Sequence, residues 1–346
     1  MMLWYLAGCI VSNSLGSILL SVKGLRKWFP IRRGFLDFIT MQPIRYIKAV
    51  DKIDFNIKKG EVFVLAGESG CGKTTTARLI LRSIEPDEGS VIFNGMNVCN
   101  LRGEELKRFR RLVQTVFQDP YSSLNPRLSV FDILLEPLII HNIRETNSER
   151  KEIVYKAMEE VKLTPIENFE HRYPHMLSGG QRQRLAIARS LILKPKLIIA
   201  DEPVSMLDLS IRAEILDLMI SLRDKYGITY LYITHDLSTA RYIGDTIAIM
   251  YLGKIVEMGI CEEVLSNPLH PYTQALIDAV LEPNPNNRFK EKKVRIIGEI
   301  PSPIDIPNGC RLNPRCPYVM EKCKLIEPPF IEFKPSHYVA CHLLID

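Results

Sequence analysis

The sequence predicts an α/β fold whose core is a largely parallel β-sheet. Three apolar runs are typical of buried strands, and they lie in VFVLA at 62–66, in KLIIADEP at 196–203 and in GITYLYITHD at 227–236. Segments with apolar residues at helical spacing alternate with these runs, as expected for parallel strands connected by helices. A chain of 346 residues has room for one large domain or two.

The first sixty residues contain an extension and two expected strands. Residues 1–20 are apolar but interrupted by polar residues, and they lack the basic start of a signal peptide, so we treat them as an N-terminal extension of unknown role. ILLSVKGLRKWFP at 18–30 and IKAVDKIDFNI at 47–57 alternate apolar and polar side chains, which favours strands. The segment between them reads as a loop insertion.

GESGCGKTT at 67–75 has the spacing G-x-x-x-x-G-K-[ST] of a phosphate-binding loop. Its glycines let backbone N–H groups approach phosphates, Lys73 can reach the β- and γ-phosphates, and the Thr74 hydroxyl can bind Mg²⁺. A strand precedes the loop and a helix follows it, which places the phosphates at a helix N-terminus. We therefore assign the loop to nucleotide binding through Gly67, Glu68, Ser69, Gly70, Cys71, Gly72, Lys73, Thr74 and Thr75.

The middle of the chain, from about residue 102 to residue 189, has a mainly helical pattern. Its basic stretch, ELKRFRRLVQ at 105–114, is more consistent with a solvated helix face than with a nucleic-acid contact. The net charge of +5 is also too small to indicate a nucleic-acid partner, and we expect none. No apolar run reaches the roughly 20 residues of a membrane helix, so we expect a cytoplasmic chain that can still dock on a membrane partner.

A carboxylate pair ends the second buried strand. Asp201 can hold Mg²⁺ through water, and Glu202 can polarise a water molecule that attacks the terminal phosphate. An acidic pair at a helix N-terminus is the structural alternative. The nearby phosphate loop favours the catalytic interpretation.

A second candidate anion site lies in LSGGQRQRLAIARSL at 177–191. Ser178, Gly179, Gly180 and Gln181 open an expected helix, whose first N–H groups and dipole attract an anion. Because this site is far from the phosphate loop in sequence, we expect the two sites to act on different nucleotides.

Together these segments resemble the ABC ATPases, a family of P-loop NTPases with a helical subdomain. The LSGGQ segment resembles the family signature. By the same resemblance, Gln118 is a ligand of ATP and Mg²⁺, Asp208 is the D-loop aspartate and His235 senses the γ-phosphate. The family implies a head-to-tail dimer, in which Ser178 and Gly180 contact the nucleotide held by the partner's phosphate loop.

The resemblance also implies a catalytic set and an adenine contact. Lys73, Glu202 and His235 are the implied catalytic residues. An aromatic residue near the start of the domain is expected to stack on adenine. Trp28 and Phe29 are both candidates, and we favour Phe29 for its place after LRK.

Longer segments resemble one branch of the family, the oligopeptide/dipeptide importers, and within it the F-type ATPase subunit. They include FQDPYSSLNPRLSV, HRYPHMLSGGQRQR and NPLHPYTQAL. The branch implies a D-type ATPase as heterodimer partner, two membrane permeases, an extracellular substrate-binding protein that acts indirectly, and a place on the cytoplasmic face of the membrane. Two departures, Met176 where Glu is usual and Met206 where Ala is usual, touch no phosphate ligand.

The implied domains are residues 1–20 as the extension, 21–260 as the nucleotide-binding domain with its helical subdomain at about 119–189, and 261–346 as a small C-terminal domain. Relatives also carry oligosaccharides or other small solutes, so the cargo stays open, as does a homodimer of ATPases. A soluble ABC ATPase of DNA repair or translation is a further alternative. It is disfavoured because the chain holds one cassette and no long insertion before the signature.

The C-terminal domain contains four cysteines, Cys310, Cys316, Cys323 and Cys341. Cytoplasmic chains seldom carry structural disulfides, so the cluster suggests a metal centre. Its spacing has no C-x-x-C pair and leaves open a [4Fe–4S] cluster, Zn²⁺ or unligated thiols. The resemblance to the importer branch favours the [4Fe–4S] cluster.

Overall fold

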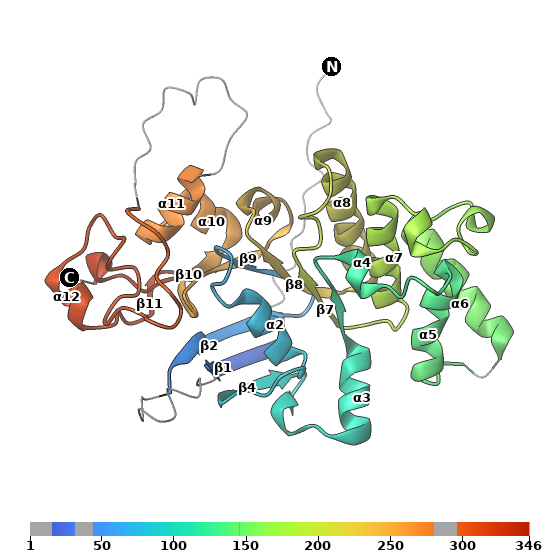
Figure 1. Cartoon of the computed structure of the whole chain (residues 1–346), viewed down its shortest axis with the longest axis horizontal. Coiled ribbons are helices and arrows are strands. Elements are labelled where there is room, and N and C mark those ends of the chain that lie inside the picture. Colours follow the sequence, from blue (N-terminus) through green and yellow to red (C-terminus); the bar gives the residue numbers. More distant parts are fainter. Residues whose placement is uncertain (1–15, 32–43, 145, 280–295, 346) are drawn as a thin grey trace, which may run out of the picture.

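The computed structural model describes residues 16–31, 44–144, 146–279 and 296–345. In this part of the chain, a central eight-stranded sheet has the order β11-β12-β10-β9-β3-β8-β7-β6, and a four-stranded sheet has the order β2-β1-β4-β5. The helices α5, α6 and α7 gather at one end of the molecule, and the C-terminal tail lies at the other end (Figure 1).

The centre of the large sheet is parallel, as the sequence predicts. Strand β3 pairs in parallel with β8 and β9, and β7 pairs in parallel with β8 and β6. All residues of β3 and β8 are buried, which explains why they read as continuous apolar runs. These strands are β3 (Val62–Ala66), β6 (Val113–Val116), β7 (Leu197–Asp201), β8 (Thr229–Thr234) and β9 (Thr246–Tyr251).

The small sheet is antiparallel and packs beside the large one. The stacked rings of Phe55 and Phe63, with centroids 4.9 Å apart, join the two sheets. Both predicted N-terminal strands are present, while residues 1–15 and 32–43 lie outside the described part. The strands are β1 (Ile18–Pro30), β2 (Tyr46–Lys58), β4 (Glu88–Phe93) and β5 (Met96–Asn97).

Helices cover the large sheet and form the expected helical group. Helix α2 begins at Lys73, directly after the phosphate loop. The segment from about residue 102 to residue 189 is mainly helical, as predicted, but the sequence analysis missed the short strand β6 within it. The helices are α2 (Lys73–Ile80), α3 (Gly103–Leu112), α4 (Pro120–Ser123), α5 (Val130–Ile140), α6 (Asn147–Glu160), α7 (Gly179–Leu191), α8 (Leu209–Tyr226), α9 (Leu237–Ile243), α10 (Cys261–Ser266), α11 (Pro271–Ala279) and α12 (Glu321–Leu325).

The C-terminal tail continues the large sheet. Strand β12 (His337–Val339) pairs antiparallel with β10 (Lys254–Ile260), and β11 (Ile331–Lys334) adds the edge strand. The physical reason is size, since so short a segment buries too little apolar surface to be stable alone. Pairing with β10 supplies that surface.

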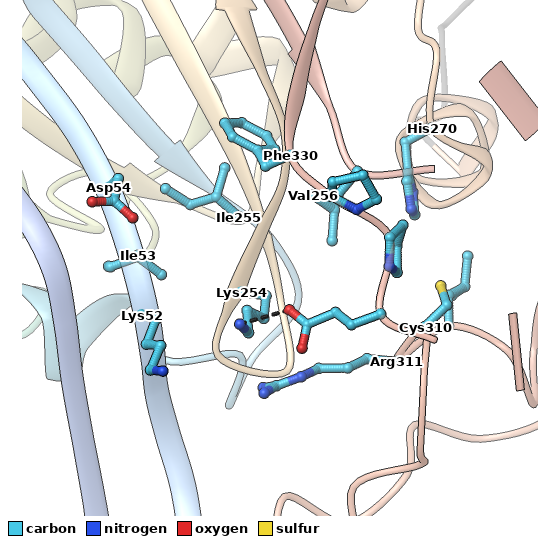
Figure 2. Close-up of a pocket in the computed structure, with 15 residues that line it drawn as sticks. Lys52, Ile53, Asp54, Lys254, Ile255, Val256, His270, Cys310, Arg311 and Phe330 are labelled. Carbon is cyan, nitrogen blue, oxygen red and sulfur yellow. Dashed lines mark ion pairs between the residues drawn. The ribbon is translucent and has the colours of Figure 1, made fainter. Parts of the chain in front are cut away.

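Buried polar contacts fix the tail to the body. His337 Nε2 lies 2.8 Å from the fully buried Glu257 carboxylate, and Arg311 forms an ion pair with Asp51. A cavity of about 290 Å³ remains along this seam (Figure 2), and Lys254 and Arg311 are among the residues that line it. Within the described residues, no helix has both the length and the apolar character needed to cross a membrane.

Candidate nucleotide-binding and hydrolysis site

The phosphate loop lies where β3 ends and α2 begins. Gly67 and Gly72 have φ values of 151° and 111°, which side chains rarely allow. A Cβ would come within 2.2 Å of the Met250 carbonyl oxygen at Gly67 and within 2.1 Å of the Ala49 carbonyl oxygen at Gly72. Glycine is therefore required at both positions, for its backbone freedom and for lack of space.

The Lys73 side chain folds back and binds the backbone of the phosphate loop. Its ammonium group is buried and donates hydrogen bonds to the carbonyl oxygens of Gly67, at 2.6 Å, and Glu68, at 2.9 Å. The charge is thereby held at the loop, and no carboxylate neutralises it there in the described structure. An anion bound in the loop would meet a positioned cation.

The expected magnesium ligands lie together. The Thr74 hydroxyl donates a hydrogen bond of 3.4 Å to Asp201, which ends β7. Burial raises the pKa of Asp201, the bond from Thr74 opposes this shift, and the neighbouring Glu202 carboxylate raises the pKa further. A divalent cation beside Asp201 would relieve this unfavourable burial of negative charge.

Glu202 stands at the centre of the candidate catalytic group. Its carboxylate accepts a hydrogen bond of 3.0 Å from Gln118 and lies 2.9 Å from His235 Nδ1. Its φ of 48° is unusual for a residue with a side chain, and such backbone strain is common at functional sites. Three segments distant in sequence thus meet at this one carboxylate.

A cavity of about 680 Å³ connects the loop with this group. Phe29 lines the cavity, whereas Trp28 packs on the Tyr46 ring and under the cationic groups of Arg26 and Lys48. The sequence analysis missed Leu276, which reaches the cavity from α11 in the C-terminal part of the chain. The lining residues are Phe29, Ile47, Ala49, Gly67, Glu68, Ser69, Gly70, Gly72, Lys73, Thr74, Thr75, Gln118, Glu202, His235 and Leu276.

Cys71 differs from the rest of the loop. Its side chain is buried in the core between the sheets, and it is absent from the lining of the cavity. Burial raises the pKa of the thiol, although Lys73 acts in the opposite direction. The thiol is therefore a packing group, and any nucleotide contact from this residue would come from its backbone.

The signature segment lies apart from this cavity. Ser178 and Gln181 form a capping box at the start of α7, in which the Gln181 N–H donates to the Ser178 hydroxyl at 3.3 Å. Ser178 and Gly179 are exposed, Gly180 is half-buried, and Asp208 is exposed at the start of α8. Neither the exposed helix start nor Asp208 lines the cavity beside the phosphate loop.

The four tail cysteines converge as free thiols. The backbone N–H of Cys310 donates to the carbonyl oxygen of Cys323 at 2.8 Å. Burial raises the pKa of Cys310 to about 12, and the thiols of Cys323, Cys341 and Cys316 contribute to that shift. Nevertheless, no group of three or more His, Cys, Asp or Glu side chains among the described residues is placed so that it could hold a metal ion.

Comparison with known proteins places this geometry in a family. The profile described as ABC transporter matches residues 50–205, and the profile described as Oligopeptide/dipeptide transporter, C-terminal region, matches residues 256–323. The chain is 46% identical to the oligopeptide transport ATP-binding protein AppF of Bacillus subtilis, over 94% of this chain and 97% of that protein. The chain belongs to the ABC transporter family.

Another relative and two solved structures agree with this placement of the ABC transporter chain. The dipeptide transport ATP-binding protein DppF of Haemophilus influenzae is 44% identical over 93% of this chain and 97% of that protein. CbiO1 from Clostridium perfringens superposes with a TM-score of 0.61 at 28% identity, covering 72% of this chain and 91% of that one. A dimeric ATP-binding cassette bound to ADP and Pi superposes with a TM-score of 0.59 at 29% identity, covering 70% and 98%.

Membership of the ABC transporter family confirms the predicted α/β ATPase fold and the predicted ATP hydrolysis. The match of the tail confirms the oligopeptide/dipeptide branch. The individual roles of the site residues stay predictions, as do the domain boundaries.

Proposed function

We propose that this chain is the ATP-hydrolysing subunit of an importer of oligopeptides or dipeptides, bound peripherally at the cytoplasmic face of the membrane. The observation that carries the proposal is the Glu202 carboxylate, held by Gln118 and His235 at the edge of the phosphate-loop cavity. The relatives named for oligopeptide and dipeptide transport support the cargo class. Oligosaccharides or other small solutes are the alternative cargo.

The loop and its strand neighbours bind and orient the nucleotide. Loop N–H groups and Lys73 hold the β- and γ-phosphates, and Phe29 stacks on the adenine ring. Thr74, Asp201 and Gln118 would hold Mg²⁺, and their oxygen ligands suit this hard cation. When bound, Mg²⁺ neutralises phosphate charge.

Glu202 then orients and polarises the attacking water. Two neighbours fix its carboxylate, so little reorganisation is needed when water is placed. His235 senses the γ-phosphate. Its half-exposed side chain lines the cavity and also contacts the Glu202 carboxylate, so it can couple the presence of the phosphate to the position of that carboxylate.

A second ATPase completes the site. The exposed Ser178, Gly179, Gly180, Gln181 and Asp208 would approach the nucleotide of a D-type partner, and the partner's equivalent segment would close this chain's cavity. Two permeases are the proposed membrane partners. A hollow of about 230 Å³ near Gln118, with the exposed apolar side chains of Phe117 and Ile140, would receive a helix of a permease.

Reconstitution tests the proposed cargo. The complete transporter, with both ATPases and both permeases in lipid vesicles, should hydrolyse ATP faster when its binding protein carries a peptide. Stimulation by an oligosaccharide-loaded binding protein and not by a peptide-loaded one would assign the alternative cargo.

We further propose that Cys310, Cys316, Cys323 and Cys341 hold a [4Fe–4S] cluster. Their convergence as free thiols supports this proposal. Zn²⁺ is the alternative occupant, and no group of the described side chains is placed to hold a metal ion, so metal analysis has to decide between the two.

The proposed centre is structural, and iron content tests it. Protein purified without oxygen should contain about four irons per chain and absorb broadly in the visible range. Cys316→Ser should remove the iron and make the tail sensitive to protease, while Cys99→Ser, on a thiol outside the group, should keep both properties. Stoichiometric zinc without iron would contradict the cluster.

A further inference from the structure

The C-terminal tail, taken as the residues from 261 onward, contacts the phosphate loop at Glu68. The hydroxyl of Tyr272, on α11, accepts a hydrogen bond of 3.0 Å from the Glu68 N–H. A guanidinium nitrogen of Arg315, 247 residues away in sequence, lies 3.4 Å from the Glu68 carboxylate. The Glu68 carbonyl oxygen accepts the hydrogen bond of Lys73. The N–H, the side chain and the carbonyl of one loop residue are therefore all engaged, two of them by the tail.

The two tail residues are themselves held rigidly. The Arg315 side chain is only 10% exposed, and it also lies 3.4 Å from the Tyr251 hydroxyl. The Tyr251 ring packs on the fully buried Tyr272 ring, with centroids 4.6 Å apart. Arg315, Tyr251 and Tyr272 thus form a packed group under the loop. Because the Arg315 side chain is largely shielded from water, its ion pair with Glu68 is stronger than an ion pair at the surface.

We propose that Arg315 and Tyr272 are positioning residues that set the phosphate loop, and through it Lys73, from the C-terminal tail. The proposal rests on the proposed phosphate-binding role of the loop. Glycine-rich loops have many accessible backbone conformations, so a loop fixed at Glu68 loses less entropy when nucleotide binds. Without the two tail contacts, Glu68 can rotate, and its carbonyl no longer aims at the Lys73 ammonium group.

Two variants remove the contacts with different side effects. Arg315→Ala removes the ion pair, and Tyr272→Phe removes one hydroxyl while it keeps the packed ring. Each should weaken ATP binding by roughly three- to tenfold, the size expected for a lost hydrogen bond to a buried partner. ATP affinity is measured by calorimetry on the full-length chain, and its thermal unfolding is followed in parallel.

The chain offers a matched control in Lys254→Gln. Lys254 forms a 2.6 Å ion pair with Glu327, another contact between body and tail, seen as the dashed line in Figure 2, and it does not touch the loop. This variant should leave ATP affinity within twofold. If Lys254→Gln weakened ATP binding as much as Arg315→Ala, the effect would be general loosening of the tail and the proposal would be overturned.

A double-mutant cycle separates positioning from folding. Glu68→Gln and Arg315→Ala remove the same ion pair, so their combined loss of ATP affinity should be smaller than the product of the single losses. Independent effects, or ATP affinity unchanged in Arg315→Ala with only the unfolding temperature lowered, would overturn the proposal. The proposed phosphate-binding role of the loop is tested separately, by the ATP affinity of the Lys73→Ala variant. If that variant binds ATP normally, the proposed function of the loop fails first.

Discussion

Replacement of Glu202 by glutamine should lower ATP hydrolysis by at least about 100-fold in the assembled transporter, while ATP binding is retained. Glutamine has nearly the same shape and can keep a contact with Gln118 or His235, but it cannot accept a proton from water. Because binding persists and hydrolysis fails, the two ATPase subunits should remain closed on their nucleotides. Phosphate release and the gel-filtration position of the nucleotide-bound complex measure the two effects.

A matched change tests whether loss of a negative charge alone is responsible. Glu159 is an exposed carboxylate on α6, remote in the chain from the residues that line the cavity, and Glu159→Gln should hydrolyse ATP near the wild-type rate. If the Glu202→Gln transporter also hydrolysed ATP near that rate, the assignment of Glu202 would be wrong.

The second large effect is expected at Lys73, one step earlier in the reaction. Lys73→Ala removes charge-assisted hydrogen bonds to phosphate, each worth roughly 1.5 to 3 kcal/mol, so ATP affinity should fall at least about tenfold. The loss should exceed the loss in either tail variant, because we propose that Lys73 contacts the phosphates directly. Calorimetric titration of the purified chain with ATP measures it, and an unchanged affinity would contradict the phosphate-loop assignment.

Local patterns were sufficient for much of the fold. The alternation in β1 and the apolar runs of β3, β7 and β8 correspond to the observed strands because each pattern reports which faces are buried. Strand β6 was missed because its burial pattern is too weak to be recognised in the sequence. Only its end residues, Val113 and Val116, are buried, and a basic helix directly precedes it, so its four residues carry little signal.

The pairing of the tail with the body could not be predicted, because pairing between distant strands leaves no local trace. Strands β11 and β12 are short, and nothing in their own residues indicates that β10 is their partner. So short a segment buries little apolar surface of its own and needs support from outside it. The structure supplies that support by sheet extension and by the buried pairs of Glu257 with His337 and of Asp51 with Arg311.

Some residues of the candidate site could also be predicted from the sequence, and others could not. The phosphate loop and the Asp201–Glu202 pair could be predicted from residue types and spacing, because their chemistry is local. The contact of Gln118 and His235 with Glu202 depends on the neighbouring places of β6, β7 and β8 in the sheet, and it was not predicted. Family resemblance suggested only that both residues act at the nucleotide. Leu276 and Tyr272 were missed, since they reach the loop from a helix with no nucleotide-binding pattern.

The rate of ATP hydrolysis by the chain alone, compared with its rate in the complete peptide transporter, tests the central claim most directly. The signature residues lie outside the chain's own cavity. On the proposed function they complete a partner's site, and the chain alone would then hold an incomplete one. We predict slow hydrolysis by the purified chain, and a rise on assembly with the second ATPase and the permeases that increases further with peptide-loaded binding protein. Fast hydrolysis by the chain alone, unchanged by its partners and by peptide, would contradict the account.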